Sequence, residues 1–197
     1  MLKRILDIIF SISLLIALLP LFLIIIFLIN LETIGGTFYT QIRVGKFNAN
    51  FKIIKFRSMY AGADLKGYLT VGDKDVRITK GGYFLRKYKL DELPQLINIL
   101  KGEMSFVGPR PEVRQFIDLL DKDQLEMLSV RPGLTDFASL KYVNESEILR
   151  ESDDPERKYI EDILPEKVRL GIDYIKRSNL YLDIKLVFMT IYQIAIK

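Results

Sequence analysis

Two adjacent carboxylates, Asp91 and Glu92, are the residues of this chain best suited to chemistry. They lie in residues 90–96 (LDELPQL), where Pro94 marks the first turn of a predicted helix. The 197-residue chain contains no His and no Cys. Catalysis by Ser–His or Cys–His pairs is therefore excluded, and so is zinc held by His or Cys. If the chain performs covalent chemistry, we expect a carboxylate to be the nucleophile, ahead of Lys or Tyr.

The carboxylate pair admits two interpretations. In the structural one, Asp91 caps the helix and Glu92 complements the helix dipole, as acidic residues at helix starts commonly do. In the functional one, the positive helix end and a neighbouring Arg86 or Lys89 lower the pKa of Asp91. The ionised carboxylate then attacks phosphorus and forms an aspartyl phosphate. Mg²⁺ is the expected ion for such chemistry, because it prefers oxygen ligands and bridges phosphates.

Several cations are suited to holding phosphate. Arg110 lies between two prolines and Arg131 precedes a third, so the backbone beside both guanidinium groups is restricted. A guanidinium fixed in this way suits bidentate contact with phosphate. Lys55 adds a positive charge on a predicted strand. Any one of these residues could equally be an ordinary surface charge or a partner in a salt bridge. Their combination with the carboxylate pair favours phosphate chemistry.

Residues 5–31 form an almost wholly apolar segment with Pro20 near its middle. A continuous helix of this length reaches about 40 Å, more than the roughly 30 Å of a hydrocarbon core. Proline inside a helix bends or breaks it, and positive residues on both flanks favour keeping both ends cytoplasmic. Two alternatives remain open from the residues alone. One is a single transmembrane span, and the other is a helix–break–helix hairpin that enters one leaflet and returns.

The remaining chain predicts a mostly helical α+β fold in one unit, residues 32–197, behind a membrane segment at 1–31. Its predicted elements are a β-hairpin (37–42 and 51–56), a polar loop (64–79), a short helix (83–87), a helix starting at Asp91 and ending at Gly102, a charged helical stretch (155–179) interrupted at Pro165, and an amphipathic segment (180–197). The last is either a core helix or a helix in the membrane interface.

The net charge of +4 suits an anionic partner. The basic residues are dispersed among acidic ones, and no nucleic-acid recognition motif is present. We therefore expect no nucleic-acid partner.

Taken together, the motifs resemble those of the bacterial sugar transferases, and in particular the small monotopic phosphoglycosyl transferases that act on polyprenyl phosphate. The resemblance covers nearly the whole chain. It is carried by residues 51–59 (FKIIKFRSM), 77–79 (RIT), 90–105 (LDELPQLINILKGEMS), 107–111 (VGPRP) and 130–135 (VRPGLT).

This resemblance implies a location and a fold. Members of the family lie on the cytoplasmic face of the bacterial inner membrane through a re-entrant helix broken at a proline, which Pro20 matches. The hairpin alternative is therefore favoured for residues 1–31. A helical catalytic core with a small β-hairpin follows, and residues 180–197 become an amphipathic interfacial helix.

The resemblance also implies a reaction. Such enzymes transfer a sugar 1-phosphate from a UDP-sugar to undecaprenyl phosphate, release UMP and so begin the assembly of a surface glycan. Asp91 would carry the phosphosugar covalently, and Glu92 would accept the proton of the incoming lipid phosphate. Mg²⁺ would neutralise the diphosphate, with Asp91 as its expected ligand. The cations expected to hold substrate phosphates are Lys55, Arg86, Arg110 and Arg131.

The alternative function is a catalytically degenerate, membrane-tethered scaffold that recruits downstream glycosyl transferases, and the intact Asp91–Glu92 pair argues against it. Residues 135–140 depart from the pattern of many members, which carry Gly and Gln there. The sugar is therefore not determined by the sequence.

Overall fold

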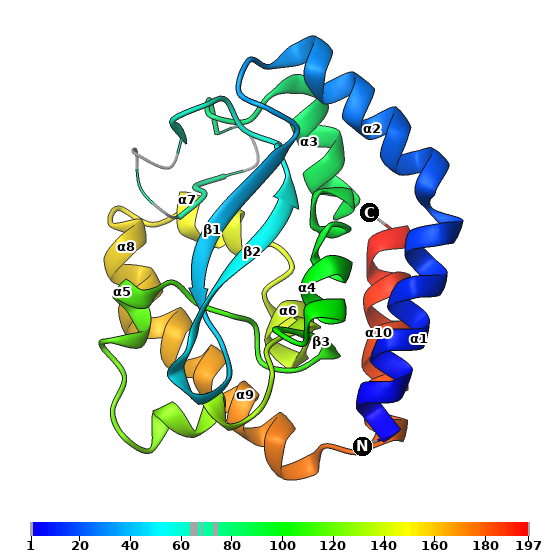
Figure 1. The fold of residues 1–197 in the computed structure, drawn as a ribbon. Coiled ribbons are helices and arrows are strands. Elements are labelled where there is room, and N and C mark those ends of the chain that lie inside the picture. Colours follow the sequence, from blue (N-terminus) through cyan, green and yellow to red (C-terminus); the bar gives the residue numbers. More distant parts are fainter. Residues whose placement is uncertain (1, 64–66, 68, 73–74, 197) are drawn as a thin grey trace.

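The structure is a computed structural model that describes residues 2–63, 67, 69–72 and 75–196. Over these residues it is a mostly helical α+β fold, as predicted, with two small sheets, of which only the hairpin was predicted (Figure 1). The described parts of the predicted loop 64–79 contain no named helix or strand. The helices are α1 (Leu2–Ala17), α2 (Leu19–Glu32), α3 (Lys80–Lys87), α4 (Gln95–Lys101), α5 (Arg114–Ile117), α6 (Phe137–Lys141), α7 (Glu145–Arg150), α8 (Pro155–Lys158), α9 (Leu164–Arg177) and α10 (Leu180–Ala195). The strands are β1 (Phe38–Val44), β2 (Asn50–Phe56), β3 (Ser105–Val107) and β4 (Gly133–Thr135).

The N-terminal apolar segment folds as two helices, α1 and α2, which are bent by 63° with respect to each other. Pro20 lies in the first turn of α2, just after the break at Leu18, where its missing N–H costs little. No single helix in the described part of the chain is long and apolar enough to cross a membrane, whereas the bent pair reaches that length and composition together. The predicted break is confirmed, and the bent pair fits either a re-entrant anchor or a broken span.

Polar side chains of α1 bind the rest of the molecule. The Arg4 guanidinium donates hydrogen bonds to the carbonyls of Ile99 (2.5 Å) and Leu100 (2.9 Å) at the end of α4. The buried Asp7 carboxylate accepts from the Ser105 hydroxyl (3.1 Å) and from the next backbone N–H (3.2 Å) in β3. Helix α1 is therefore held against the two elements that flank the predicted active-site motifs.

The predicted β-hairpin is confirmed. Strands β1 and β2 pair antiparallel, and Phe38 lies opposite Phe56 in the register. The fully buried Asn98 of α4 joins the hairpin to the helix: its amide donates to the Lys52 carbonyl (2.7 Å) and its carbonyl oxygen accepts from the Ile54 N–H (3.0 Å). These two bonds hold β2 on either side of Ile53, two residues before Lys55.

Strands β3 and β4 pair in parallel and bring the VGPRP and VRPGLT motifs together. Two glycines make the approach possible. A Cβ atom on Gly108 would lie 2.4 Å from the Arg131 carbonyl oxygen, and one on Gly133 would lie 2.2 Å from the Gly108 nitrogen. The two motifs therefore pack backbone against backbone, and Arg110 lies three residues after the end of β3.

From residue 155 to residue 195 the chain is mostly helical, as predicted. The charged stretch is divided into α8, a π-helical turn (Tyr159–Ile163) and α9, which has Pro165 in its first turn. Residues Val113, Phe116 and Val168 belong to the large core cluster beneath these helices. Helix α10 lies beside α1 (Figure 1), and an ion pair of 2.8 Å between Lys3 and Asp183 joins them. The interfacial role of α10 stays a prediction.

Candidate active site

Asp91 lies in a tight turn and not in the first turn of a regular helix. Residues Leu90–Glu92 form one turn of 3₁₀-helix, and α4 begins only at Gln95. Pro94 has no N–H to donate to the Leu90 carbonyl, which accepts instead from the Leu93 N–H at 3.2 Å, as in a 3₁₀ turn. Lys89, just before the turn, has a left-handed backbone with φ of 55°. The expectation that Asp91 caps the helix is therefore wrong.

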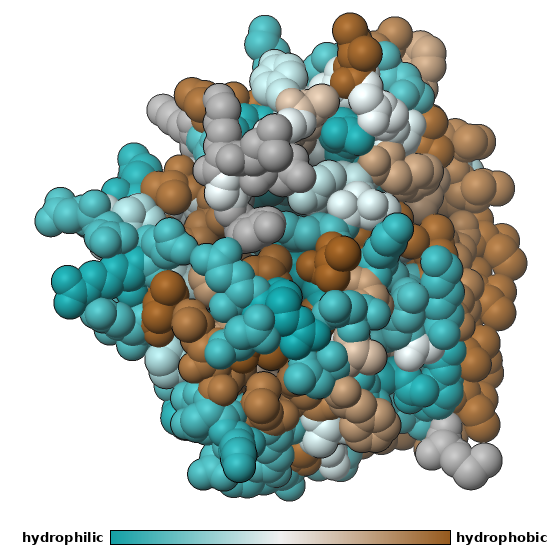
Figure 2. All heavy atoms as spheres, turned by 60° about the vertical axis from the view of Figure 1, so that its left-hand side comes forward, coloured by the Kyte–Doolittle hydropathy of each residue, from teal (hydrophilic) through white to brown (hydrophobic). Residues whose placement is uncertain are grey.

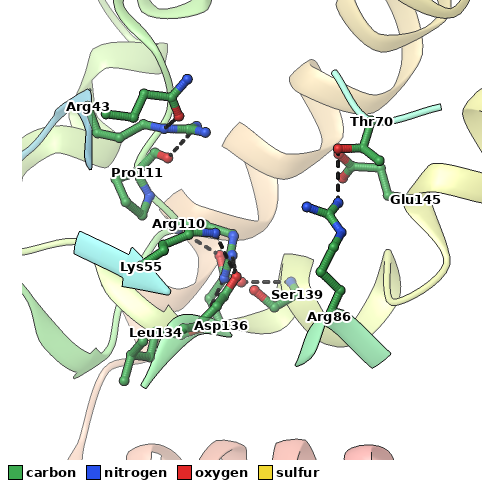
Figure 3. Close-up of polar contacts among 12 residues, drawn as sticks. Arg43, Lys55, Thr70, Arg86, Arg110, Pro111, Leu134, Asp136, Ser139 and Glu145 are labelled. Carbon is green, nitrogen blue, oxygen red and sulfur yellow. Dashed lines mark hydrogen bonds and ion pairs between the residues drawn. The ribbon is translucent and has the colours of Figure 1, made fainter. Parts of the chain in front are cut away.

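Glu92 is the centre of a charged cluster. Its Oε1 accepts hydrogen bonds from the Lys55 ammonium at 3.0 Å and from the Arg110 guanidinium. Arg110 is held in turn by the Leu134 carbonyl, 3.2 Å from its side chain, and by Asp136, whose Oδ2 accepts from the Arg110 backbone N–H at 3.2 Å. Figure 3 shows Lys55 and Arg110 converging from β2 and from the segment after β3. Four distant chain segments thus build the cluster.

Asp91 is also buried, but one of its carboxyl oxygens lacks the hydrogen bonds that Glu92 accepts. The residue is 4% exposed, and its Oδ1 has no hydrogen-bond partner. Burial raises the pKa of Asp91 above its ordinary value, although the positive charge of Lys55 opposes the shift. The sequence-based expectation of a lowered pKa is wrong, because burial outweighs Arg86 and Lys89. One oxygen of the Asp91 carboxyl is therefore engaged by no hydrogen bond.

The neighbouring carboxylate is perturbed in the opposite direction. Burial alone would raise the pKa of Glu92, but Arg110 and then Lys55 outweigh it and hold the pKa well below its usual range. Burial lowers the pKa of Lys55, and Glu92 partly restores it. Two adjacent carboxylates whose pKa values are pushed apart are a common arrangement at catalytic sites, since each can then fill a different role.

The other two predicted cations have different positions. Arg86 of α3 lines the same cavity as Asp91 and donates to the Thr70 hydroxyl at 2.9 Å (Figure 3). Arg131 is not among the residues that line this cavity. Its Nε donates to the Gly102 carbonyl at 2.7 Å, at the C-terminal end of α4. The structure brings Lys55, Arg86 and Arg110 together with the carboxylate pair, and it places Arg131 as a helix cap.

The site opens into a cavity of about 820 Å³, a volume typical of small-molecule sites. Its polar wall contains Asp91, Glu92 and their cations. Other parts of its lining come from the α1–α2 break and from α10, where the residues are mainly apolar. One cavity therefore joins a charged site to an apolar wall.

The site offers few oxygen donors for the expected Mg²⁺ ion. Within the described ranges, no group of three or more Asp or Glu residues is placed to hold a metal ion. Asp91 offers a free, buried oxygen, whereas the Oε1 of Glu92 is occupied by two cations. Magnesium is commonly bound by one or two carboxylates together with substrate phosphates. The donors fit a Mg²⁺ ion shared with the substrate and do not fit an all-protein site.

Sequence reasoning missed three residues of the site. Asp136 accepts a hydrogen bond from the Arg110 backbone N–H, and its Oδ1 caps α6 by accepting from the Ser139 N–H at 2.7 Å. An Asp before a helical stretch is a sequence signal that could have identified this residue. Asn98 and Thr70 act through contacts with distant segments, and no local pattern indicates them.

With this geometry in place, the comparisons with known proteins identify the family. The whole chain, residues 1–197, matches the sequence profile described as bacterial sugar transferase. The chain belongs to this family. The resemblance read from the motifs is therefore confirmed.

Among its relatives is an Aeromonas hydrophila protein named UDP-N-acetylgalactosamine-undecaprenyl-phosphate N-acetylgalactosaminephosphotransferase, 38% identical over 87% of this chain and 38% of the relative. The UDP-glucose:undecaprenyl-phosphate glucose-1-phosphate transferase of Escherichia coli K12 is 32% identical over 98% of this chain and 40% of its own length. Exopolysaccharide production protein ExoY of Sinorhizobium fredii is 34% identical over 96% of this chain and 83% of its own length. This sugar transferase thus spans less than half of the first two relatives.

Proposed function

We propose that this sugar transferase moves a sugar 1-phosphate from a UDP-sugar to undecaprenyl phosphate through a covalent intermediate on Asp91. The names of two relatives describe the transfer of a sugar phosphate from a UDP-sugar to undecaprenyl phosphate. The observation that carries the proposal is the buried Asp91 carboxyl with an unpartnered Oδ1, in a cavity that also contains Lys55, Arg86 and Arg110. A nucleophile in such a setting has the room and the cations that a diphosphate substrate requires.

In the first step, an oxygen of the ionised Asp91 attacks the β-phosphorus of the UDP-sugar. The bond from that phosphorus to the oxygen bridging the two phosphates breaks, and UMP leaves with the bonding electron pair. The product is an acyl phosphate that carries the sugar. The raised pKa of Asp91 supports this role, because a poorly stabilised carboxylate is a stronger nucleophile than a fully hydrogen-bonded one.

In the second step, a phosphate oxygen of the polyprenyl acceptor attacks the same phosphorus. The Asp91 carboxylate leaves and is regenerated, and polyprenyl diphosphate-sugar is formed. Both substrates are anionic, so their mutual repulsion must be neutralised before either step. Lys55, Arg86 and Arg110 supply three positive groups for this purpose.

The contacts of Glu92 favour an orienting role over the proton acceptance expected from the sequence. Its pKa lies well below the usual range, which makes it a weak base in the resting site. By accepting from both Lys55 and Arg110, it fixes the positions of two cations that the substrate phosphates then meet. When bound, Mg²⁺ would be held by Asp91 and substrate oxygens, and it would supply charge neutralisation to the diphosphate.

We also propose that α1, α2 and the outer face of α10 lie in the cytoplasmic leaflet of the bacterial inner membrane. Large apolar side chains such as Phe10, Phe27 and Phe188 are more than half exposed on these helices. Figure 2 shows hydrophobic residues concentrated along one edge of the molecule, while most of that view is hydrophilic. An exposed apolar surface of this kind is typical of membrane contact.

The reaction is tested by incubating the full chain with a UDP-sugar in the absence of any lipid acceptor. Peptide mapping by mass spectrometry is expected to find a phosphosugar on Asp91, with a matching amount of released UMP. The Asp91→Asn variant is expected to give neither. Turnover that proceeds with an unmodified Asp91, or in the Asn variant, would refute the covalent route. A folded wild-type protein that releases no UMP with any donor would favour the scaffold alternative.

The membrane arrangement is tested by labelling. Because the chain contains no Cys, a single introduced Cys is unique. In membrane vesicles, Leu2→Cys and Ile34→Cys are expected to react with an impermeant reagent from the same side. Reaction from opposite sides would show a span and contradict the re-entrant arrangement.

A further inference from the structure

Five apolar side chains from the α1–α2 break and from α10 form a part of the catalytic cavity's lining, here called the apolar branch, that the donor chemistry does not use. Leu14 and Leu18 line it from the α1–α2 break, and Val187, Ile191 and Ile194 line it from the C-terminal half of α10. In Figure 1 the C-terminal end of α10 lies beside the break between α1 and α2. These residues face the same cavity as Asp91, although they belong to the first and last helices of the chain.

The same helices carry the exposed apolar surface of the molecule. Leu14 is 38% exposed and Ile191 is 57% exposed, so these two lining residues also belong to that surface. The polar side chains of α10 in this region are already engaged: the Thr190 hydroxyl is 2.5 Å from that of Thr135, and Gln193 donates to the Leu140 carbonyl at 3.1 Å. The wall therefore offers aliphatic contact and few free polar groups.

A ligand that fits this branch has an apolar chain on one side and an anionic group on the other. The charged end of the cavity, with Lys55, Arg86 and Arg110, matches a phosphate. The aliphatic end matches a hydrocarbon chain, which gains free energy there in proportion to the apolar area it buries. A UDP-sugar is polar along its whole length and has no part that matches the aliphatic end.

We infer that the isoprenoid chain of the lipid acceptor enters the cavity between the α1–α2 break and the C-terminal half of α10, with Leu14 and Ile191 at the mouth. The acceptor phosphate then reaches the phosphosugar on Asp91 from the apolar side, while the UDP-sugar occupies the polar side. This inference rests on the proposed function and assigns it a second binding region.

The test compares two substitutions of the same residue type on the same helix. Ile191→Glu places a charge in the apolar branch. Ile184→Glu is the matched control: Ile184 lies two turns earlier on α10, is 49% exposed, and does not line the cavity. Two reactions are measured with the full chain in nanodiscs: UMP release and Asp91 modification with a UDP-sugar alone, and transfer to undecaprenyl phosphate.

Ile191→Glu is expected to retain the donor reaction within about twofold, which also shows that the site is folded. Its KM for undecaprenyl phosphate is expected to rise by about tenfold or more, corresponding to the loss of roughly one side chain's apolar contact. The kcat at saturating acceptor should change little. Ile184→Glu is expected to match the wild type in both reactions.

Equal acceptor kinetics in the two variants would overturn the inference, and so would loss of the donor reaction in Ile191→Glu alone, since the branch would then serve the donor. If the wild-type protein itself forms no adduct and releases no UMP, the proposed function fails at that stage. The two failures are therefore distinguishable.

Discussion

Replacing the proposed nucleophile by its neutral isostere is expected to stabilise the protein. Asp91 is buried, and its Oδ1 has no hydrogen-bond partner, so its ionised form is disfavoured in the folded state. Asp91→Asn removes the charge and keeps the shape. We expect the free energy of unfolding at pH 8 to rise by about 1–2 kcal/mol. For a chain of this size that corresponds to a Tm increase of roughly 2–8 °C.

The pH dependence follows from the direction of the pKa shift. The folded pKa of Asp91 is raised above the unfolded value, so wild-type Asp91 favours the folded state below its unfolded pKa, near 3.9. That contribution is lost as the pH rises through the folded pKa. The advantage of the Asn variant should therefore be largest at pH 8 and should vanish as the pH falls below 4, where Asp91 is neutral in both the folded and the unfolded state.

Glu92→Gln is the matched comparison, and it should lower the free energy of unfolding, whereas Asp91→Asn should raise it. The folded pKa of Glu92 is lowered, so its contribution to stability is present above the unfolded pKa, near 4.3, and is lost only as the pH falls through the folded value. The Gln variant leaves Lys55 and Arg110 buried without their counter-charge. Breaking a buried ion pair costs about 3–5 kcal/mol, or roughly 6–20 °C in Tm.

Thermal unfolding of the three proteins can be followed by circular dichroism, because the chain has no Trp for intrinsic fluorescence. A chelator removes any metal that would neutralise Asp91. Stability shifts of the same sign in both variants would contradict the opposite environments assigned to the two carboxylates. An Asp91→Asn advantage that is independent of pH would show that the buried charge is not its cause.

Three further predictions concern packing and metal. Asp7→Ala should lower the free energy of unfolding by about 1–3 kcal/mol, because it leaves one buried and one partly buried donor of β3 unpaired. Asp7→Asn, which keeps an acceptor, should lose less, and equal denaturation midpoints for the two variants would contradict this. Gly133→Ala should lower the free energy of unfolding by about 3 kcal/mol or more, because the added Cβ would meet backbone atoms. At Gly81 the added Cβ would meet only the end of the Glu32 side chain, so the free energy of unfolding of Gly81→Ala should lie within about 1 kcal/mol of the wild-type value. EDTA should abolish UMP release and added Mg²⁺ should restore it; unchanged activity in EDTA would remove the metal from the mechanism.

Local patterns predicted the parts of this fold that depend on a few consecutive residues. The break near Pro20, the hairpin around residues 45–49 and the stop of α4 at Gly102 follow from backbone chemistry that proline and glycine impose locally. The start of α4 was predicted wrongly, because a capping residue at Asp91 and a proline three positions later are compatible with either an α-helix or a 3₁₀ turn. Only the surrounding packing decides between them.

The sequence by itself determined the family and the types of group available: two carboxylates, a set of cations, and no imidazole or thiol. The tertiary structure decided which of them meet. It placed Arg131 at the end of α4 and away from the cavity, and it gave Asp91 and Glu92 opposite pKa shifts. The physical reason is that burial and charge pairing depend on partners from distant segments, such as Lys55, which sequence spacing does not reveal.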